Sequence, residues 1–119
     1  MSALGKALIT KVREIAEGHP GFLYEAPPVQ DDDTHCMYVY GGEPSCLLGR
    51  AAWDLRLIDA SINRMDNVTT ITDLAEKSDW DIDEVELNWL SEVQDRQDFG
   101  ETWGESVKYA DREWDALYA

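Results

Sequence analysis

One stretch near the end of the chain repeats its apolar residues at the spacing of an α-helix. The repeats are three or four positions apart, which places them on one side of a helix, and they are Trp103, Val107, Ala110, Trp114 and Leu117. Thr102, with Glu105 three positions later, has the pattern of a capping box that starts many helices. A helix with one apolar side is stable in water when that side packs against other elements. The sequence therefore predicts a packed helix over residues 103–117.

Four further segments have the apolar spacing of helices and a polar residue that can cap their first turn. They are 2–17 with Ser2, 46–57 with Ser45, 70–77 with Thr70, and 82–97 with Asp81 and its capping-box partner Glu84. The second of these has a broad apolar face, which is typical of a central, mostly buried helix. We expect residues 59–69 to form a loop with about one helical turn.

Two short segments rich in aromatic and aliphatic residues predict strands. They are 21–25 and 35–40, and the stretch between them holds two prolines and three consecutive aspartates, which predicts a loop. We expect the strands to pair antiparallel across this loop. The predicted fold class is α+β, mainly helical, with about five helices and a small two-stranded antiparallel sheet. We expect a single domain over 1–119, with the sheet and two helices in 1–58 and an acidic three-helix segment in 70–117.

Acidic residues are concentrated in the second half of the chain. Of the formal net charge of −15, residues 69–119 contribute −11, from fifteen Asp or Glu against four Lys or Arg. Such a charge repels nucleic-acid phosphates and anionic membranes and attracts basic proteins. The chain also has no apolar run long enough to span a bilayer and no N-terminal apolar stretch with a cleavage site. We expect a cytoplasmic protein with a basic protein partner, no direct nucleic acid and no membrane, and the oligomeric state stays open.

Two cysteines and two histidines raise the possibility of a thiol enzyme or a metal site. Cys46 stands at the start of a predicted helix, where a thiol can have a lowered pKa and act as a nucleophile, and His35 is a candidate base for it. The order His19, His35, Cys36, Cys46 lacks the compact ligand spacings of structural zinc. The alternative is that both cysteines are small, buried core residues. We expect reduced thiols, no metal, no cofactor and no catalytic residue.

Two acidic patterns in the second half resemble known binding motifs but depart from them at essential positions. Alternating aspartates from Asp79 onward resemble the start of a calcium-binding EF-hand loop, but Glu84 and Leu90 stand where the loop needs Gly and Glu. Residues 70–93 have the outline of a helix-turn-helix, yet carboxylates crowd the end of the helix that would meet DNA. Acids at a helix start are stabilised by the helix dipole, so both patterns favour a structural interpretation.

The candidate binding surface consists of residues that have no expected structural role. Trp89, Trp103 and Trp114 lie on apolar stripes and are expected in the core, whereas Trp80 stands between two aspartates in a predicted turn and is expected to be exposed. Aromatic residues beside acids suit a partner rich in Arg and Lys. The predicted partner-binding residues are Asp79, Trp80, Asp83, Glu86, Asp95, Asp98 and Glu101.

Two segments of the chain share features with a known group of proteins. Residues 36–58, CMYVYGGEPSCLLGRAAWDLRLI, combine a strand, a Gly-containing turn, a Pro-Ser-Cys step and a helix beginning Leu-x-Gly. Residues 89–110, which include WLSEVQDRQDFGETWGESV, are similar to the same group. In these features the chain resembles small uncharacterised accessory proteins of actinobacterial viruses (phages). The resemblance implies a phage protein that works in the cytoplasm of a bacterial host, and it implies no catalytic or binding residue.

Three functional hypotheses follow from these observations. The leading one is a small, acidic, non-enzymatic interaction protein that binds a basic host or phage protein through an acidic helical face. The first alternative is a DNA mimic that inhibits a nucleic-acid-binding protein, which requires carboxylates in two rows. The second alternative is a small cysteine-dependent enzyme using Cys46, which requires an exposed thiol within hydrogen-bonding reach of His35.

Overall fold

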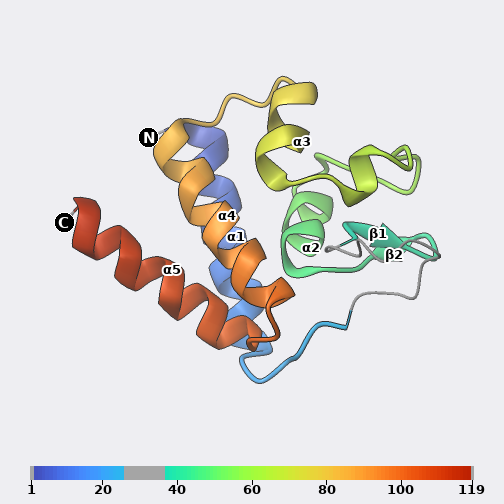
Figure 1. Ribbon diagram of the computed structural model, residues 1–119. Helices are drawn as coiled ribbons and strands as arrows, with labels where there is room; N and C mark the ends of the chain where they lie inside the picture. The colour runs from blue at the N-terminus through green and yellow to red at the C-terminus, as the bar shows by residue number, and fades with distance from the viewer. Residues whose placement is uncertain (1, 26–36, 119) are drawn as a thin grey trace.

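The computed structural model of the protein describes residues 2–25 and 37–118, and within them it has five α-helices and a two-stranded antiparallel sheet (Figure 1). The helices are α1 (Ala3–Gly18), α2 (Leu47–Asp54), α3 (Ile71–Lys77), α4 (Glu84–Asp98) and α5 (Trp103–Tyr118), with a short 3-10 helix η1 (Asp66–Val68) before α3. The predicted fold class, mainly helical α+β with a small antiparallel sheet, is confirmed.

The sheet is a short hairpin whose position differs from the prediction. β1 (Val39–Tyr40) pairs with β2 (Glu43–Pro44) across Gly41 and Gly42. These glycines have φ values of 64° and 81°, in the left-handed region that two-residue hairpin turns require and that glycine adopts without steric cost. The predicted pairing of 21–25 with 35–40 is therefore wrong, although residues 35 and 36 lie outside the described part of the chain.

The predicted strand at 21–25 instead closes the start of α5. The backbone N–H of Trp103 donates to the carbonyl of Phe22, and that of Gly104 to the carbonyl of Pro20, both at 3.0 Å. The Phe22 ring also packs on the Trp103 indole, with 4.4 Å between ring centroids. The first turn of a helix leaves its amides without helical partners, so this apolar segment is held by α5 rather than by a neighbouring strand.

Three predicted helix caps are present, and two are corrected. Ser2, Thr70 and Thr102 each accept a hydrogen bond from the backbone N–H three residues later, as expected for α1, α3 and α5. At α2 the cap is Cys46 rather than Ser45, and its sulfur accepts from the N–H of Gly49 at 3.4 Å. The prediction was wrong there because Ser45 is used elsewhere, with its hydroxyl 3.0 Å from that of Tyr24.

The start of α4 lies two residues later than predicted. Asp83, not Asp81, is the cap, and it forms a full capping box with Glu86 rather than a pair beginning with Glu84. The N–H of Glu86 donates to Asp83 at 2.9 Å, and Glu86 Oε1 accepts the N–H of Asp83 at 3.2 Å. Both registers have acids three residues apart, so local sequence alone does not choose between them.

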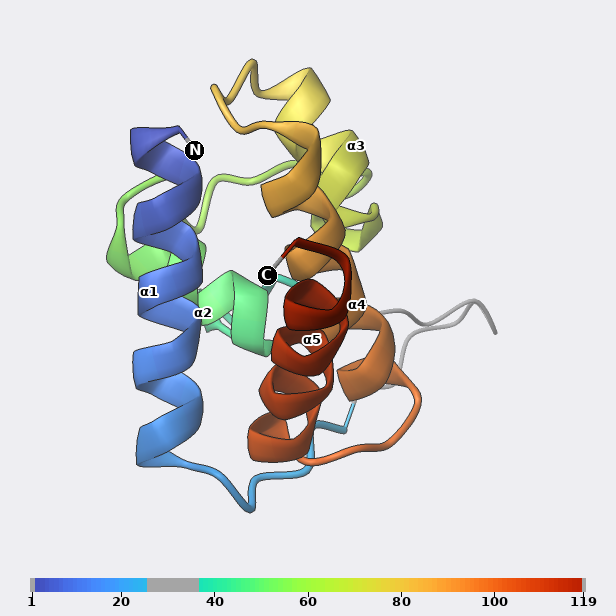
Figure 2. The ribbon, with the colours of Figure 1, turned by 90° about the vertical axis from the view of Figure 1, so that its left-hand side faces the viewer.

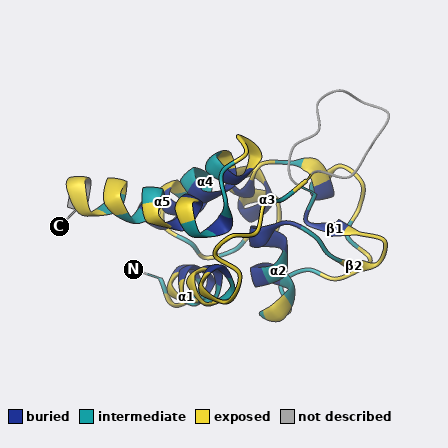
Figure 3. Ribbon diagram, turned by 90° about the horizontal axis from the view of Figure 1, so that it is seen from below, coloured by how far each residue is buried: buried dark blue, intermediate teal, exposed yellow. Residues whose placement is uncertain are grey.

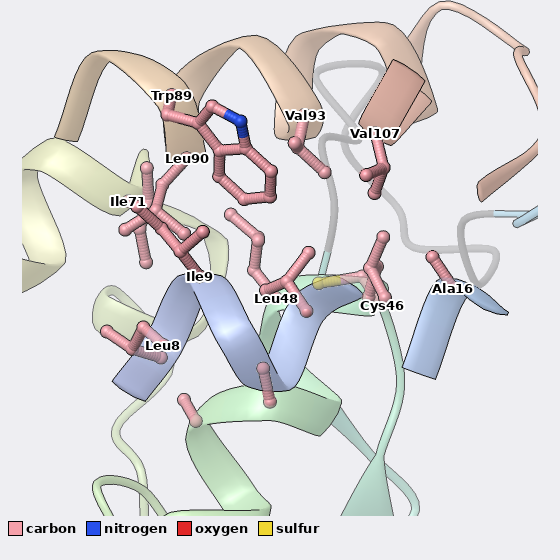
Figure 4. Packing of buried hydrophobic residues seen from close by; sticks show 14 of the residues in the cluster. Leu8, Ile9, Ala16, Cys46, Leu48, Ile71, Trp89, Leu90, Val93 and Val107 are labelled. Atoms are coloured by element: carbon pink, nitrogen blue, oxygen red, sulfur yellow. The ribbon is translucent and has the colours of Figure 1, made fainter. Parts of the chain in front are cut away.

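The long helices α1, α4 and α5 form one side of the molecule, with α2 packed between α1 and α4 and with α3 and the hairpin on the other side (Figures 1 and 2). All five helices contribute buried side chains to one core. Figure 4 shows part of it, where α1 and α2 face α3, α4 and α5 through Leu8, Leu48, Ile71, Trp89, Leu90 and Val107. The buried sides of the helices point inward, and the last turns of α5 extend beyond the body as an exposed end (Figure 3).

The buried side of α4 also carries polar side chains, and these join it to the starts of three other helices. Each uses its Oε1 to accept a backbone N–H at a helix start, and the pairs are Ser2 to Glu86 at 3.3 Å, Ile71 to Gln94 at 2.9 Å and Leu47 to Gln97 at 2.9 Å. The indole N–H of Trp103, at the start of α5, donates to the same oxygen of Gln97 at 2.9 Å. Helix α4 therefore holds polar contacts with every other helix start.

Tyr38 anchors the hairpin to the rest of the fold. Its side chain is fully buried, and its hydroxyl donates to the carbonyl of Thr69 and accepts from Gln94, both at 2.8 Å. Burial raises the pKa of the Tyr38 phenol well above its ordinary value, because the phenolate would lose its hydration. The phenol therefore stays protonated at neutral pH and keeps its role as a hydrogen-bond donor.

Candidate functional site

The predicted partner-binding residues do not form one cluster but gather at the two ends of α4. Asp79, Trp80 and Asp83 precede the helix, whereas Asp95, Asp98 and Glu101 lie at or after its end. The helix spans fifteen residues, so these groups are separated by roughly 20 Å at 1.5 Å per residue. A single small contact could not include both.

Glu86 is removed from the predicted binding surface by its burial. Its side chain is 0 % exposed, and its Oε1 accepts hydrogen bonds from the hydroxyl of Ser2 at 2.6 Å and from the backbone of Ser2 and Asp83. A carboxylate in this position joins α1 to the start of α4 and offers no surface to a partner. Its inclusion in the binding set was an error that only the packing of α1 against α4 reveals.

The acids and the tryptophan before α4 also have structural roles. Asp83 is exposed but serves as the helix cap, and Asp79 has a φ of 56°, in the left-handed region that Asp tolerates better than most residues. Trp80 is half-buried and packs against the core, so the expectation that it would be exposed is wrong. Trp89 and Trp103 are in the core as predicted, with 2 % and 1 % exposure, whereas Trp114, also expected there, is only partly buried and packs against the core.

At the other end of α4, two of the three predicted residues face solvent. Asp95 and Asp98 are exposed, and Asp98 accepts a hydrogen bond from the side chain of Gln97 at 3.0 Å. Glu101 instead forms an ion pair with Arg96, at 3.7 Å. The Arg96 guanidinium also lies 3.6 Å from the centre of the Tyr109 ring, a cation–π arrangement, so its charge is directed toward α5.

The solvent side of α4 carries an acidic surface that the predicted set included only in part. At 100° per residue, the four residues of this surface fall within an arc of about 120°, and they are Glu84, Glu92, Asp95 and Asp98. We call this the acidic face of α4. Helical spacing from Asp95 locates Glu84 and Glu92 on the same side of the helix. Glu84 is not in the predicted set because it is expected to pair with Asp81 in the helix cap, a role that Glu86 has with Asp83. Arg96 is the only basic residue of α4, and it is engaged by Glu101 and Tyr109.

A groove opens beside the acidic face, between α4 and α5. It has a volume of about 250 Å³ and is lined by Val85, Asn88, Trp89, Ser91 and Glu92 of α4 and by Ala110, Glu113 and Trp114 of α5. In Figure 1 the two helices diverge toward the C-terminal end of α5. The groove is open to solvent. Carboxylates of both helices lie at its edges, and its lining contains neither Lys nor Arg.

On the other side of Trp114, a smaller hollow between α1 and α5 has the opposite charge. It measures about 140 Å³ and is lined by Lys6, Ile9, Thr10, Arg13 and Trp114. Arg13 is held there by Asp111, 2.6 Å away, and its guanidinium lies 5.2 Å from the Trp89 ring centre. Asp111 also accepts the indole N–H of Trp89 at 2.9 Å. Arg13 and Asp111 thus tie α1, α4 and α5 together beside this hollow.

Cys46 lies in the core and not in an accessible site. It is 0 % exposed and disulfide-bonded, so the expectation of a reduced thiol at this position is corrected. The geometry required by the thiol-enzyme hypothesis, an exposed Cys46 sulfur, is absent, while Cys36 and His35 lie outside the described residues. Cys46 therefore acts here as a helix cap and a core residue.

Residues 2–25 and 37–118 contain neither a metal-binding cluster nor a membrane-spanning helix. Within these ranges, no group of three or more His, Cys, Asp or Glu side chains is arranged to hold a metal ion. In the same ranges, none of the helices combines the length and the apolar character that crossing a membrane requires.

Comparison of the chain with models of protein families, with curated proteins and with solved structures finds no match in any of the three.

Proposed function

We propose that the protein is a small binding protein that recognises a basic protein partner through the acidic face of α4. The observation that carries this proposal is the excess of acid on that side of the molecule. Seven acids between residues 79 and 98 are at least partly exposed, namely Asp79, Asp81, Asp83, Glu84, Glu92, Asp95 and Asp98, whereas Arg96 is the single basic residue of the same stretch. If the resemblance to phage accessory proteins holds, the partner is a host or phage protein.

The density of charge on α4 favours a protein partner over mimicry of DNA. Duplex DNA carries one charge per about 1.7 Å of its axis, in two strands. The acidic face has four carboxylates on one helix over roughly 20 Å, which is one per about 5 Å. Spaced Lys and Arg side chains of a protein match that pattern better than a site built for a nucleic acid.

Charge reversal of the acidic face tests the proposal. The variant Glu84→Lys, Asp95→Lys, Asp98→Lys changes three exposed residues, and the matched control Glu17→Lys, Glu43→Lys, Asp54→Lys makes the same charge change at exposed positions elsewhere. Both are used with the unchanged protein to capture proteins from an actinobacterial lysate. We expect a basic partner that the control retains and the face variant loses, with binding that weakens as salt is raised.

Equal retention of the partner by both variants would show that the acidic face is not the binding surface. Circular dichroism of each variant provides the control for folding. Reversal of Glu84 in the first turn of α4 costs about 0.3–1 kcal/mol through the helix dipole, and reversal of Asp98 also removes its hydrogen bond from the Gln97 side chain, worth about 0.5–1.5 kcal/mol. These losses are smaller than the roughly 5–15 kcal/mol that stabilises a folded domain.

A further inference from the structure

Carboxylates on an exposed helix are a weak source of affinity. A solvent-exposed ion pair contributes about 0–1 kcal/mol, so the acidic face can steer and orient a partner more than it can hold one. Tight recognition usually depends on a few buried apolar anchors surrounded by polar contacts. If the proposed function is right, an apolar site next to the acidic face is required.

The groove between α4 and α5 has the composition of such a site. Trp89 and Ala110 are almost fully buried at its base, while Val85 and Trp114 are partly buried along it. Glu92 belongs both to the groove lining and to the acidic face, so the two surfaces are continuous. An apolar floor with carboxylates at the edges is complementary to an apolar side chain with Lys or Arg neighbours.

The size of the groove indicates what kind of ligand it can hold. Sites for small molecules and cofactors usually measure about 300–1,000 Å³ and enclose most of the ligand, whereas this groove measures about 250 Å³ and is open to solvent. A volume of this order accommodates one large side chain. The size therefore favours an anchor residue of a protein over a separate small ligand.

The acid at the groove also argues against a second copy of the chain as its occupant. Each copy has a net charge of −15, and Glu92 and Glu113 lie in the groove lining. Self-association through this surface would bring like charges together, which is unfavourable. A basic partner gains from the same charges.

Resting on the proposed function, we propose that the α4/α5 groove binds one large apolar side chain of a basic helical segment of the partner. Lys and Arg residues of that segment, on the turns before and after the anchor, pair with Glu92 and Glu113 and with the rest of the acidic face. A helix laid in a groove between two helices presents residues three and four positions apart to the same surface, so one segment can supply both the anchor and the flanking charges.

The test uses three labelled synthetic helical peptides of about 18 residues, long enough to form helix in water. The first is rich in Lys and Ala with one central Trp, the second has Ala in place of that Trp, and the third has Glu in place of every Lys. Binding to the full-length protein is measured by fluorescence anisotropy at physiological salt. We expect the first peptide to bind about tenfold or more tightly than the second, from burial of the anchor, and the third not to bind.

A groove-blocking variant localises the anchor. Asn88 is exposed and lines the groove, so Asn88→Trp fills the groove without changing charge, and Ala60→Trp at an exposed loop position is the matched control. In the Asn88→Trp variant the Trp peptide should bind about as weakly as the Ala peptide, and the affinity of the Ala peptide should stay unchanged. Ala60→Trp should change the affinity of neither peptide. Amide shifts of the unchanged protein should move at Val85, Asn88, Ala110 and Glu113.

Three other outcomes of the peptide-binding test would overturn the groove inference, and one of them would overturn the proposed function as well. Equal binding of the Trp and Ala peptides, together with loss of both in the Glu84, Asp95 and Asp98 reversal variant, overturns the groove inference and leaves the proposed function standing. No binding of either basic peptide overturns both. Concentration-dependent dimerisation that Asn88→Trp abolishes would assign the groove to a second copy and also overturn the inference.

Discussion

On its buried side, α4 presents Glu86, Gln94 and Gln97 to the first residues of three other helices, whereas on its solvent side it presents Glu84, Asp95 and Asp98 to water. Both sides are polar, and in sequence the two sets of residues are interspersed along the same fifteen positions. The buried side chains accept hydrogen bonds from backbone N–H groups that are shielded from water and would otherwise lack partners. The exposed acids face solvent, and Asp98 in addition accepts a hydrogen bond from the Gln97 side chain. The difference teaches that a polar residue of α4 is structural or available for binding according to its side of the helix and not according to its type.

The largest loss of stability should come from Gln97→Ala. This change leaves the N–H of Leu47 and the indole N–H of Trp103 buried without an acceptor, in addition to a cavity. Unsatisfied buried donors cost about 1–3 kcal/mol each, so we expect a loss of about 3 kcal/mol in the free energy of unfolding, measured by urea denaturation. Asn88→Ala, at an exposed amide of the same helix, is the control and should have little effect. A similar loss of unfolding free energy in Gln97→Ala and Asn88→Ala would show that the buried and solvent sides of α4 do not differ in structural role.

The next largest loss in the free energy of unfolding should come from Glu86→Ala. The effect of a substitution at Gly5 should depend on whether Glu86 is present. Glu86→Ala removes the acceptor for Ser2 and Asp83 and should cost about 2 kcal/mol, whereas Glu84→Ala, two residues away and exposed, should cost much less. A Cβ at Gly5 would collide with the Glu86 carboxylate, so Gly5→Ala should destabilise the unchanged protein by about 1–3 kcal/mol.

In the Glu86→Ala background the collision is gone, and Gly5→Ala should become neutral or stabilising, because Ala favours a helix over Gly by about 1 kcal/mol. A double-mutant cycle by urea denaturation measures this coupling. Additive effects of the two substitutions would show that Glu86 does not lie against α1 as described.

A smaller effect should appear at alkaline pH through Tyr38. Because its pKa is raised in the folded protein, stability from this group is fully present below the unfolded pKa of about 10 and is lost as pH rises above that value, where only the unfolded chain ionises readily. Urea denaturation between about pH 9 and pH 11 should show a steeper decline for the unchanged protein than for Tyr38→Phe. Equal slopes would contradict burial of this phenol.

The smallest effect on stability should come from Asp95→Asn, on the acidic face. The residue is exposed, and such substitutions usually change the free energy of unfolding by less than about 0.5 kcal/mol. Under the proposed function, the same change weakens binding of the basic peptides by a few-fold and reduces their salt dependence. A loss of stability similar to that of Glu86→Ala would show that the acidic face is structural.

Part of the site could be predicted from the sequence, and the reason for the rest is physical. Exposure of Asp95 and Asp98 follows from helical periodicity, which depends on local geometry. Burial of Glu86 does not, because its environment is made by Ser2, more than eighty residues away along the chain. The groove could not be predicted either, since it results from the angle between two helices and not from either one.

The class of fold, the approximate extent of the five helices and the acidic character of the second half follow from local sequence, because apolar spacing and charge are properties of neighbouring residues. Tertiary structure decided the hairpin pairing, the register at the start of α4, and the use of segment 21–25 at α5 instead of in a sheet. In each of these cases two local arrangements were available to the chain. The choice depended on which one gave distant backbone amides and apolar surfaces a partner.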